Sequence, residues 1–229
     1  MKYTSALIVG AGSGLSASLA RAFAQAGMKV ALAARSIDKL ADLARETKAK
    51  TFACDATNKA DVDSLFAALD AEGSTDVVIY NASYRTRGPL LELDPGDVEK
   101  SIQVSAFGGF LVAQAAVRRM LPNGHGAILF TGASASVKGY AQSVPFAMGK
   151  FALRGLAQSM ARELAPQGLH IGHFVIDGGI RSARRAEPSD KPDSLLDPDA
   201  IAQSYLHVLN QPRSAWTWEI ELRPWIEKF

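Results

Sequence analysis

The sequence predicts an α/β protein with one doubly wound domain, in which a seven-stranded parallel sheet is flanked by helices on both faces. Short apolar runs alternate with helical periodicity from one end of the 229 residues to the other, a pattern typical of repeated β-α-β units. The early runs are apolar without alternation, as expected of strands that are buried on both faces. A glycine-rich turn directly follows the first of them, at positions 10–14.

In chain order the predicted elements are strand 6–9, helix 15–27, strand 29–34, helix 37–47, strand 51–54, helix 59–72, strand 76–80, helix 95–121, strand 127–131, helix 144–165, strand 170–176, helix 198–210 and strand 216–222. No fixed-period repeat and no linker-like composition interrupts this order, so residues 1–229 are predicted to form a single domain. The polar, proline-bearing stretch 181–197 is predicted to be a lid-like loop. Because it follows the sixth strand, we expect it at the carboxyl edge of the sheet, where open α/β sheets bind ligands.

The composition argues against several functional classes. Hydrophobic residues make up 48% and charged residues 21% of the chain, which is ordinary for a globular protein. The formal net charge of +2 gives no reason to expect a nucleic-acid partner. We interpret the basic run Arg181, Arg184 and Arg185 as a solvated loop, and the alternative is that it contacts a phosphate. The single cysteine, Cys54, excludes an intrachain disulfide and fits a reducing compartment. No membrane-length apolar stretch or signal-type segment is visible, so we expect a cytoplasmic protein without a membrane partner.

The four histidines, His125, His170, His173 and His207, do not show the spacing of metal ligands. His170 and His173 are three positions apart in a predicted strand, which places them on opposite faces. We therefore predict no metal site and interpret these residues as core or surface histidines.

The turn that contains Gly10, Gly12, Ser13, Gly14 and Leu15 follows a strand and opens a helix, which is the setting of a Rossmann-type nucleotide site. Glycine permits a positive φ and the close approach of a diphosphate, which then lies at the positive end of the helix. The alternative is a plain tight turn. A methyltransferase turn for S-adenosylmethionine is disfavoured, because such sites usually place an acid at the end of the second strand.

The end of the second predicted strand carries Arg35 and Ser36 and no carboxylate. An NAD site usually has an acid here that binds the ribose 2′-hydroxyl, whereas a guanidinium forms charge-assisted bonds with a 2′-phosphate. The sequence therefore favours NADP(H) over NAD(H). The alternative interpretation is that Arg35 lies at the strand end in contact with water only.

In their order and spacing these motifs resemble the short-chain dehydrogenase/reductase family over nearly the whole chain. Gly10 and Gly14 match two glycines of the family turn, whereas Val9 and Ser16 depart from its first and last positions. Ser16 is small enough to keep the helix close to the strand, so we expect binding to be retained. The resemblance implies further cofactor contacts at Asp55, Ala56, Asn81, Ala82, Ser83, Lys150, Gly178 and Ile180.

The family's active-site tetrad is Asn, Ser, Tyr and Lys, and alignment on Lys150 places the first three at Ser105, Ala133 and Phe146. The chain thus resembles an atypical branch of the family, with Phe for Tyr and the lysine retained. Phenylalanine cannot transfer a proton, and a positioned acid contributes about 10² to 10⁴ in rate. The candidate substitutes are Tyr84, Tyr140 and Lys150 as proton donors and Ser134 as an oxyanion donor; surface or packing roles are the alternative.

The resemblance implies an NADP(H)-dependent oxidoreductase that acts on a small carbonyl or alcohol with a non-standard proton donor. The alternative is a catalytically silent cofactor binder that serves as a sensor or a partner subunit. Loops 83–95, 133–145 and 181–197 are expected to shape the substrate pocket, and their Ala, Val and Tyr residues suggest an apolar one. Relatives pair the helices that correspond to 95–121 and 144–165 across a dyad, so a homodimer or homotetramer is expected.

Overall fold

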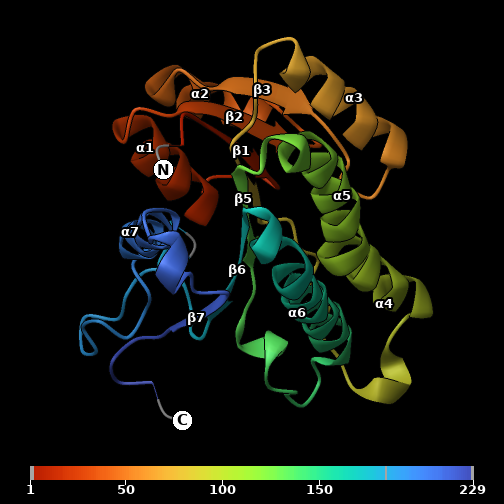
Figure 1. The fold of residues 1–229 in the computed structure, drawn as a ribbon. Helices are drawn as coiled ribbons and strands as arrows, with labels where there is room; N and C mark the ends of the chain where they lie inside the picture. The colour runs from red at the N-terminus through yellow and green to blue at the C-terminus, as the bar shows by residue number, and fades with distance from the viewer. Residues whose placement is uncertain (1–2, 184, 228–229) are drawn as a thin grey trace.

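The computed structural model describes residues 3–183 and 185–227. At its centre is a seven-stranded sheet in the order β3-β2-β1-β4-β5-β6-β7, and all neighbouring strands run parallel (Figure 1). The strands are β1 (Ser5–Val9), β2 (Lys29–Ala34), β3 (Lys50–Ala53), β4 (Val77–Tyr80), β5 (Gly126–Thr131), β6 (Leu169–Ile176) and β7 (Glu219–Leu222). The predicted parallel sheet is confirmed.

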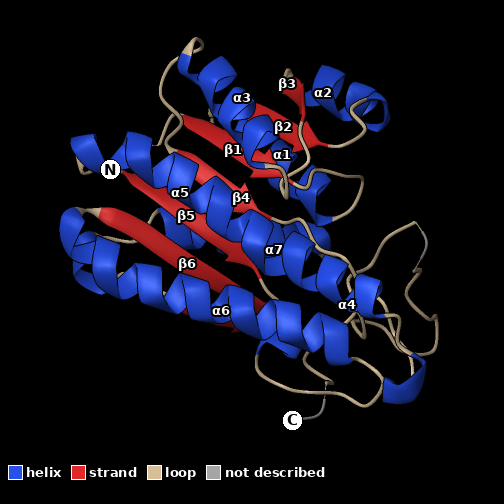
Figure 2. Ribbon diagram, turned by 90° about the vertical axis from the view of Figure 1, so that its right-hand side faces the viewer, coloured by secondary structure: helices blue, strands red, loops and turns tan. Residues whose placement is uncertain are grey.

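Helices cover both faces of this sheet (Figure 2). They are α1 (Leu15–Gln25), α2 (Ala41–Thr47), α3 (Lys59–Asp70), α4 (Pro95–Ile102), α5 (Gly108–Met120), α6 (Val144–Leu164) and α7 (Pro198–Leu209). Side chains from α1, α2 and α7 pack on one face, and those from α3, α5 and α6 pack on the other. Each face has its own apolar cluster, and the central strands are buried between the two, which explains their unbroken apolar runs.

The order of the strands changes direction between β1 and β4. From β1 the chain first builds outward to β2 and β3, and it then returns to add β4 on the other side of β1. Val9 and Tyr80 are paired at the carboxyl ends of these two strands. A crevice opens at such a switch point because the connections on its two sides lead away from each other.

The helix predicted over 95–121 is three consecutive segments, which corrects the prediction of one continuous helix. A π-helical turn, Gln103–Phe107, separates α4 from α5. The buried Tyr80 hydroxyl donates a hydrogen bond of 2.5 Å to the carbonyl of Val104 inside this turn. Gly108 follows at a point where a Cβ would lie 2.4 Å from the same hydroxyl. The insertion of a side-chain hydroxyl into the helical ladder is a recognised cause of such an irregularity.

The last strand is shorter than the predicted 216–222. The side chain of Gln211 accepts a hydrogen bond from the Thr217 backbone at 2.8 Å and donates one to the Thr217 hydroxyl at 3.0 Å. Trp216 stacks on His170 with ring centroids 4.5 Å apart. These contacts hold 216–217 in the connection that leads to β7.

Residues 181–183 and 185–197 form a loop, and backbone hydrogen bonds close its two ends. The Arg181 amide donates to the Leu196 carbonyl at 2.9 Å, and the Leu196 amide donates to the Gly179 carbonyl at 2.8 Å. The Leu196 side chain is buried against the core. The base of this loop is therefore fixed, and its middle extends into solvent (Figure 1). Arg184, part of the basic run noted in the sequence, lies outside the described residues.

Candidate functional site

A cleft of about 470 Å³ lies across the carboxyl ends of β1 to β4. Ten of the residues predicted to bind a cofactor line it together: Gly10, Gly12, Ser13, Arg35, Ser36, Asp55, Ala56, Asn81, Ala82 and Ser83. These residues come from four separate loops. The fold therefore brings the predicted cofactor residues into a single continuous surface at the switch point.

The turn after β1 is pressed against the end of β4. Gly10 has a φ of +81°, and a Cβ on it would lie 2.4 Å from the backbone nitrogen of Ala82. Ser16 donates a hydrogen bond from its hydroxyl to the Gly10 carbonyl at 3.2 Å, and it accepts one from the Asn81 amide at 2.7 Å. Ser16 stands where the family has a glycine, and its two hydrogen bonds connect the turn to the residue that follows β4.

Gly14 and Leu15 form the start of α1 at the edge of this cleft. Gly14 is the N-cap and provides no side-chain cap, and the first turn of α1 contains no acid. The Leu15 side chain is buried, so this residue offers only its backbone. The free N–H groups and the helix dipole make this end of α1 suitable for a diphosphate.

The opposite end of the cleft is cationic. Arg35 and Ser36 are exposed after β2, and Lys39, one helical turn further on, lines the same wall. Lys39 was not identified from the sequence. Its position, four residues after Arg35 at the end of the second predicted strand, could have indicated a second cation at the same wall. Asp38, which lies between Arg35 and Lys39 in the chain, does not line the cleft, so this wall presents two cations that suit the 2′-phosphate of NADP(H).

Asp55 lies on the wall between these two ends. Its carboxylate accepts hydrogen bonds from the Thr57 backbone at 2.9 Å and from the Thr57 hydroxyl at 2.7 Å. The pKa of Asp55 is lowered, mainly by the hydrogen bond from the Thr57 backbone. Burial opposes this shift, whereas the Thr57 hydroxyl and the positive charge of Arg35 add to it. Burial raises the pKa of the neighbouring Cys54 thiol to about 11, so this cysteine stays protonated and packs as a small apolar residue.

Lys150, also predicted to bind the cofactor, does not line this cleft and is almost fully buried. Its Nζ donates a hydrogen bond of 2.7 Å to the Thr131 carbonyl and lies 5.8 Å from the centre of the Phe146 ring. Burial lowers the pKa of Lys150 from 10.5 to about 8. The Lys150 amine is already hydrogen-bonded to the Thr131 carbonyl of β5. To contact the cofactor ribose as predicted, the amine must either donate a second hydrogen bond or give up this one.

Ser105, which is aligned with the family asparagine, lies in the π-helical turn against α6. Its hydroxyl is buried and has no hydrogen-bond partner among the described residues. A Cβ on Gly149 would lie 2.8 Å from the Ser105 Cβ and 2.9 Å from the Ser101 carbonyl. Gly149 therefore allows α6 to approach this turn closely enough to place Lys150 beside it.

The proposed substitute donors lie in different environments. The Tyr84 hydroxyl donates to Asp97 on α4 at 2.8 Å, and this bond raises its pKa. Tyr140 is exposed on the loop between β5 and α6. Ser134 begins a short helical turn after β5, and Ser136, two positions on, accepts a hydrogen bond from the backbone of Ala133 at 3.1 Å. Thus the hydroxyl of Tyr84 is already hydrogen-bonded to Asp97, whereas Tyr140 is exposed to solvent.

Arg85 is a residue that sequence reasoning missed. Its guanidinium lies over the Phe146 ring, 5.0 Å from the ring centre. Arg85 belongs to none of the family motifs found in the sequence. It lies on the loop between β4 and α4, which is held by a contact with the loop before α6. No signal in the sequence identified it.

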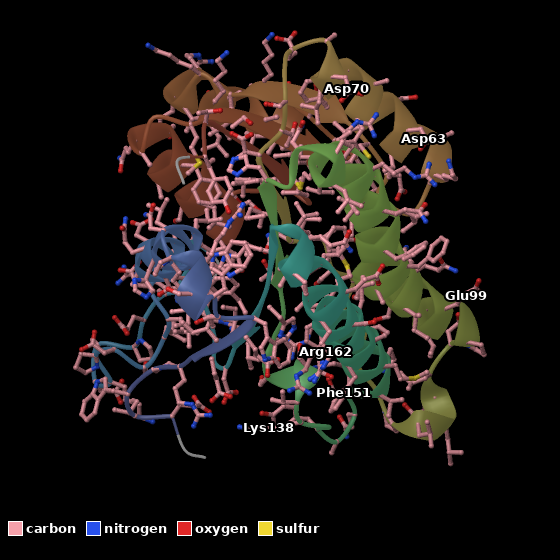
Figure 3. All side chains as sticks on the ribbon, in the orientation of Figure 1. Asp63, Asp70, Glu99, Lys138, Phe151 and Arg162 are labelled. Carbon is pink, nitrogen blue, oxygen red and sulfur yellow. The ribbon has the colours of Figure 1, made fainter. Side chains whose placement is uncertain are left out.

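Gly178 and Ile180 are at the base of loop 181–197 and do not line the cleft. Ile180 forms an isolated bridge with Leu196. The preceding Asp177 is buried and pairs with Lys138 at 3.0 Å and Arg223 at 2.7 Å. Figure 3 labels Lys138, which belongs to the loop before α6. This network ties that loop to the ends of β6 and β7.

The two histidines of β6 are buried on opposite faces of the sheet, as predicted. His173 Nδ1 lies 3.0 Å from Glu219, and burial lowers its pKa to about 4. Over 3–183 and 185–227 no group of three or more His, Cys, Asp or Glu residues is arranged to hold a metal ion. None of the described helices is both long enough and apolar enough to span a membrane.

Comparison with known proteins agrees with this geometry. The chain is 30% identical over 226 residues to an uncharacterized oxidoreductase of Staphylococcus aureus, with 96% of each chain covered. It is 34% identical to a crystal structure of a short-chain dehydrogenase from Rhodopseudomonas palustris, which covers 98% of this chain and 100% of that one, with a TM-score of 0.84. An alcohol dehydrogenase from the archaeon Thermococcus sibiricus, complexed with 5-hydroxy-NADP, is 25% identical, covers 99% of both chains and has a TM-score of 0.85. The family model for short chain dehydrogenases matches residues 4–192, and the chain therefore belongs to the short-chain dehydrogenase family of oxidoreductases.

Proposed function

We propose that this oxidoreductase uses NADP(H) in preference to NAD(H). The observation that carries the proposal is the single cleft with the glycine turn before α1 at one end and Arg35, Ser36 and Lys39 at the other. The cations after β2 would bind a 2′-phosphate, whereas Asp38, the acid of that segment, does not line the cleft and so is not placed to bind a free 2′-hydroxyl. The NADP analogue bound to the Thermococcus sibiricus relative supports the same cofactor class.

We further propose that the chain belongs to an atypical branch in which Phe146 replaces the tyrosine acid. The bound cofactor supplies or accepts a hydride at the carbon of a small carbonyl or alcohol. Lys150 is the favoured proton donor to the carbonyl oxygen, because its pKa of about 8 allows it to release a proton near neutral pH. Tyr140 and Ser134 are the remaining candidates, and Tyr84 is less suitable because Asp97 holds its hydroxyl.

The test is a steady-state assay of NADPH oxidation with a panel of small aldehydes and ketones. Lys150→Met, Tyr140→Phe, Tyr84→Phe and Ser134→Ala are compared with the unmodified protein. The donor should be the variant that loses about 10² to 10⁴ in kcat, with NADPH binding measured separately. Full activity in all four would contradict the proposal. Tight NADPH binding without turnover of any carbonyl would instead support the silent cofactor binder.

We also propose a homodimer formed through α5 and α6. Phe107, Phe110, Met148 and Phe151 are exposed on this side of the molecule, and the first two rings stack with centroids 6.2 Å apart. Figure 3 labels Phe151 on α6. A contiguous apolar surface of this kind is usually covered by a partner. Sedimentation should show a dimer or a tetramer that Phe151→Glu weakens, and a monomeric unmodified protein would contradict the proposal.

A further inference from the structure

Three arginines lie on loops that were expected from the sequence to shape an apolar pocket. Arg85 and Arg87 lie on the loop between β4 and α4, and Arg185 lies on loop 181–197. Burial and then the positive charges of Arg87 and Arg185 lower the pKa of Arg85. All three residues are exposed, and Arg85 lies within the electrostatic range of the other two.

No carboxylate of the described chain neutralises this cluster. Other cations of the same loops are paired, since Lys138 bonds Asp177 at 3.0 Å and Arg181 bonds Asp197 at 2.5 Å. In residues 3–183 and 185–227, no ion pair involves Arg85, Arg87 or Arg185. The positive charge around Arg85 is thus not offset by an ion pair of the described residues, and an anion bound there would be stabilised by it.

The cluster lies at the catalytic end of the site. The Arg85 guanidinium and the Lys150 amine both lie against the Phe146 ring, at 5.0 Å and 5.8 Å from its centre. The Gly88 amide donates to the Gln142 carbonyl at 3.1 Å, which holds the Arg85 loop against the loop before α6. The Arg185 side chain lies over the backbone of Gly179. These cations are separate from Arg35 and Lys39 at the end of β2.

We propose that Arg85, assisted by Arg87 and Arg185, binds a carboxylate of the substrate, so that the substrate is a carbonyl or hydroxy acid. The Arg85 guanidinium lies 5.0 Å from the centre of the Phe146 ring and takes part in no ion pair with the described residues, and a guanidinium can form two parallel bonds with a carboxylate. Because Phe146 occupies the position aligned with the family's tyrosine, a carboxylate bound by Arg85 would lie beside the proposed reacting centre. This assignment rests on the proposed oxidoreductase function and gives its substrate class.

The experiment compares acids with their uncharged methyl esters. Pyruvate and levulinate place the carboxylate at two distances from the ketone, and each is titrated calorimetrically, beside its ester, into the protein saturated with NADP⁺. NADPH oxidation with the same four compounds gives kcat/KM. The variants are Arg85→Met, Arg85→Lys and, as the matched control, Arg118→Met, which removes an exposed arginine from the last turn of α5, at the opposite edge of the sheet.

At least one acid should bind about ten-fold or more tightly than its ester, since a charge-assisted pair is worth that factor. Arg85→Met should abolish this preference, Arg85→Lys should weaken it, and Arg118→Met should leave it unchanged. Equal binding of acids and esters, or a preference that survives Arg85→Met, would overturn the proposal. An increase in the Kd of NADPH in Arg85→Met would overturn it too, because the cluster would then serve the cofactor.

The same titrations on the cofactor-free protein keep the two proposals apart. A preference for the acids in a protein that binds no NADPH would contradict the oxidoreductase function and leave the carboxylate site standing. NADPH binding and turnover without any preference for an acid would support the oxidoreductase function and contradict the carboxylate site.

Discussion

The guanidinium of Arg85 lies 5.0 Å from the centre of the Phe146 ring. Phe146 occupies the position that alignment on Lys150 assigns to the family's tyrosine, and its ring is buried at the start of α6. The aromatic ring is thus retained without its hydroxyl, and the face of the ring now supports two cations, Arg85 and Lys150.

Phe146→Tyr should restore a positioned acid. We expect kcat to rise about ten-fold or more, since general acids contribute about 10² to 10⁴ when well placed. Steady-state kinetics with NADPH and a carbonyl acid measure the effect. Phe151→Tyr, an exposed position on the same helix, is the control and should not change kcat. An unchanged or lower kcat in Phe146→Tyr would mean that this ring does not lie at the reacting centre.

Gly10→Ala should destabilise the protein and prevent NADPH binding. The new Cβ would meet the Ala82 backbone at 2.4 Å, at a φ of +81° that side chains rarely adopt. The expected loss is at least about 2 kcal/mol in urea unfolding. Gly12→Ala is the matched control for stability, because nothing lies within 4 Å of its added Cβ. Equal stability of the two variants would contradict the close contact between the turn and β4.

Gly149→Ala should destabilise the contact between α6 and the π-helical turn. Its Cβ would come within 2.9 Å of the Ser101 carbonyl and 2.8 Å of the Ser105 Cβ, so the helix must move outward and take Lys150 with it. A loss of stability of about 1–3 kcal/mol is expected, together with lower activity.

Gly155→Ala on the same helix meets no atom within 4 Å. This variant should be neutral or more stable by about 0.5–1 kcal/mol, because alanine favours the helix. The opposite order of stability between Gly149→Ala and Gly155→Ala would show that α6 does not pack as described.

Lys150→Met should change the pH dependence of stability in the cofactor-free protein. The folded-state pKa of Lys150, about 8, is below its usual 10.5, so the buried charge costs stability in full below pH 8. Between about pH 8 and pH 10.5, Lys150 is deprotonated in the folded protein but still protonated in the unfolded chain. Over this range the unfolding free energy of the unmodified protein therefore rises with pH relative to that of Lys150→Met.

The difference in unfolding free energy between the two proteins should therefore shift by about 3 kcal/mol from about pH 7 to about pH 11. Urea titrations at several pH values measure it. A difference that stays constant with pH would show that Lys150 is not buried as a charged amine.

Sequence patterns predicted the parts of this molecule that depend on local chemistry. The apolar runs predicted the strands, and the glycines after β1, with Arg35 and Asn81, predicted residues that line one cleft. The patterns failed where a distant side chain decides the local structure. The interruption between α4 and α5 depends on the Tyr80 hydroxyl bonding the Val104 carbonyl, and the position of Arg85 depends on a loop held by Gln142.

The central claim is that this chain binds NADP(H) through the cleft from α1 to Arg35. The most direct test is a fluorescence titration of the purified protein with NADPH and, separately, with NADH, repeated with Arg35→Ala. The account predicts that NADPH binds about ten-fold or more tightly than NADH, and that Arg35→Ala removes most of this preference. Equal affinity for both cofactors, or no binding of either, would contradict it.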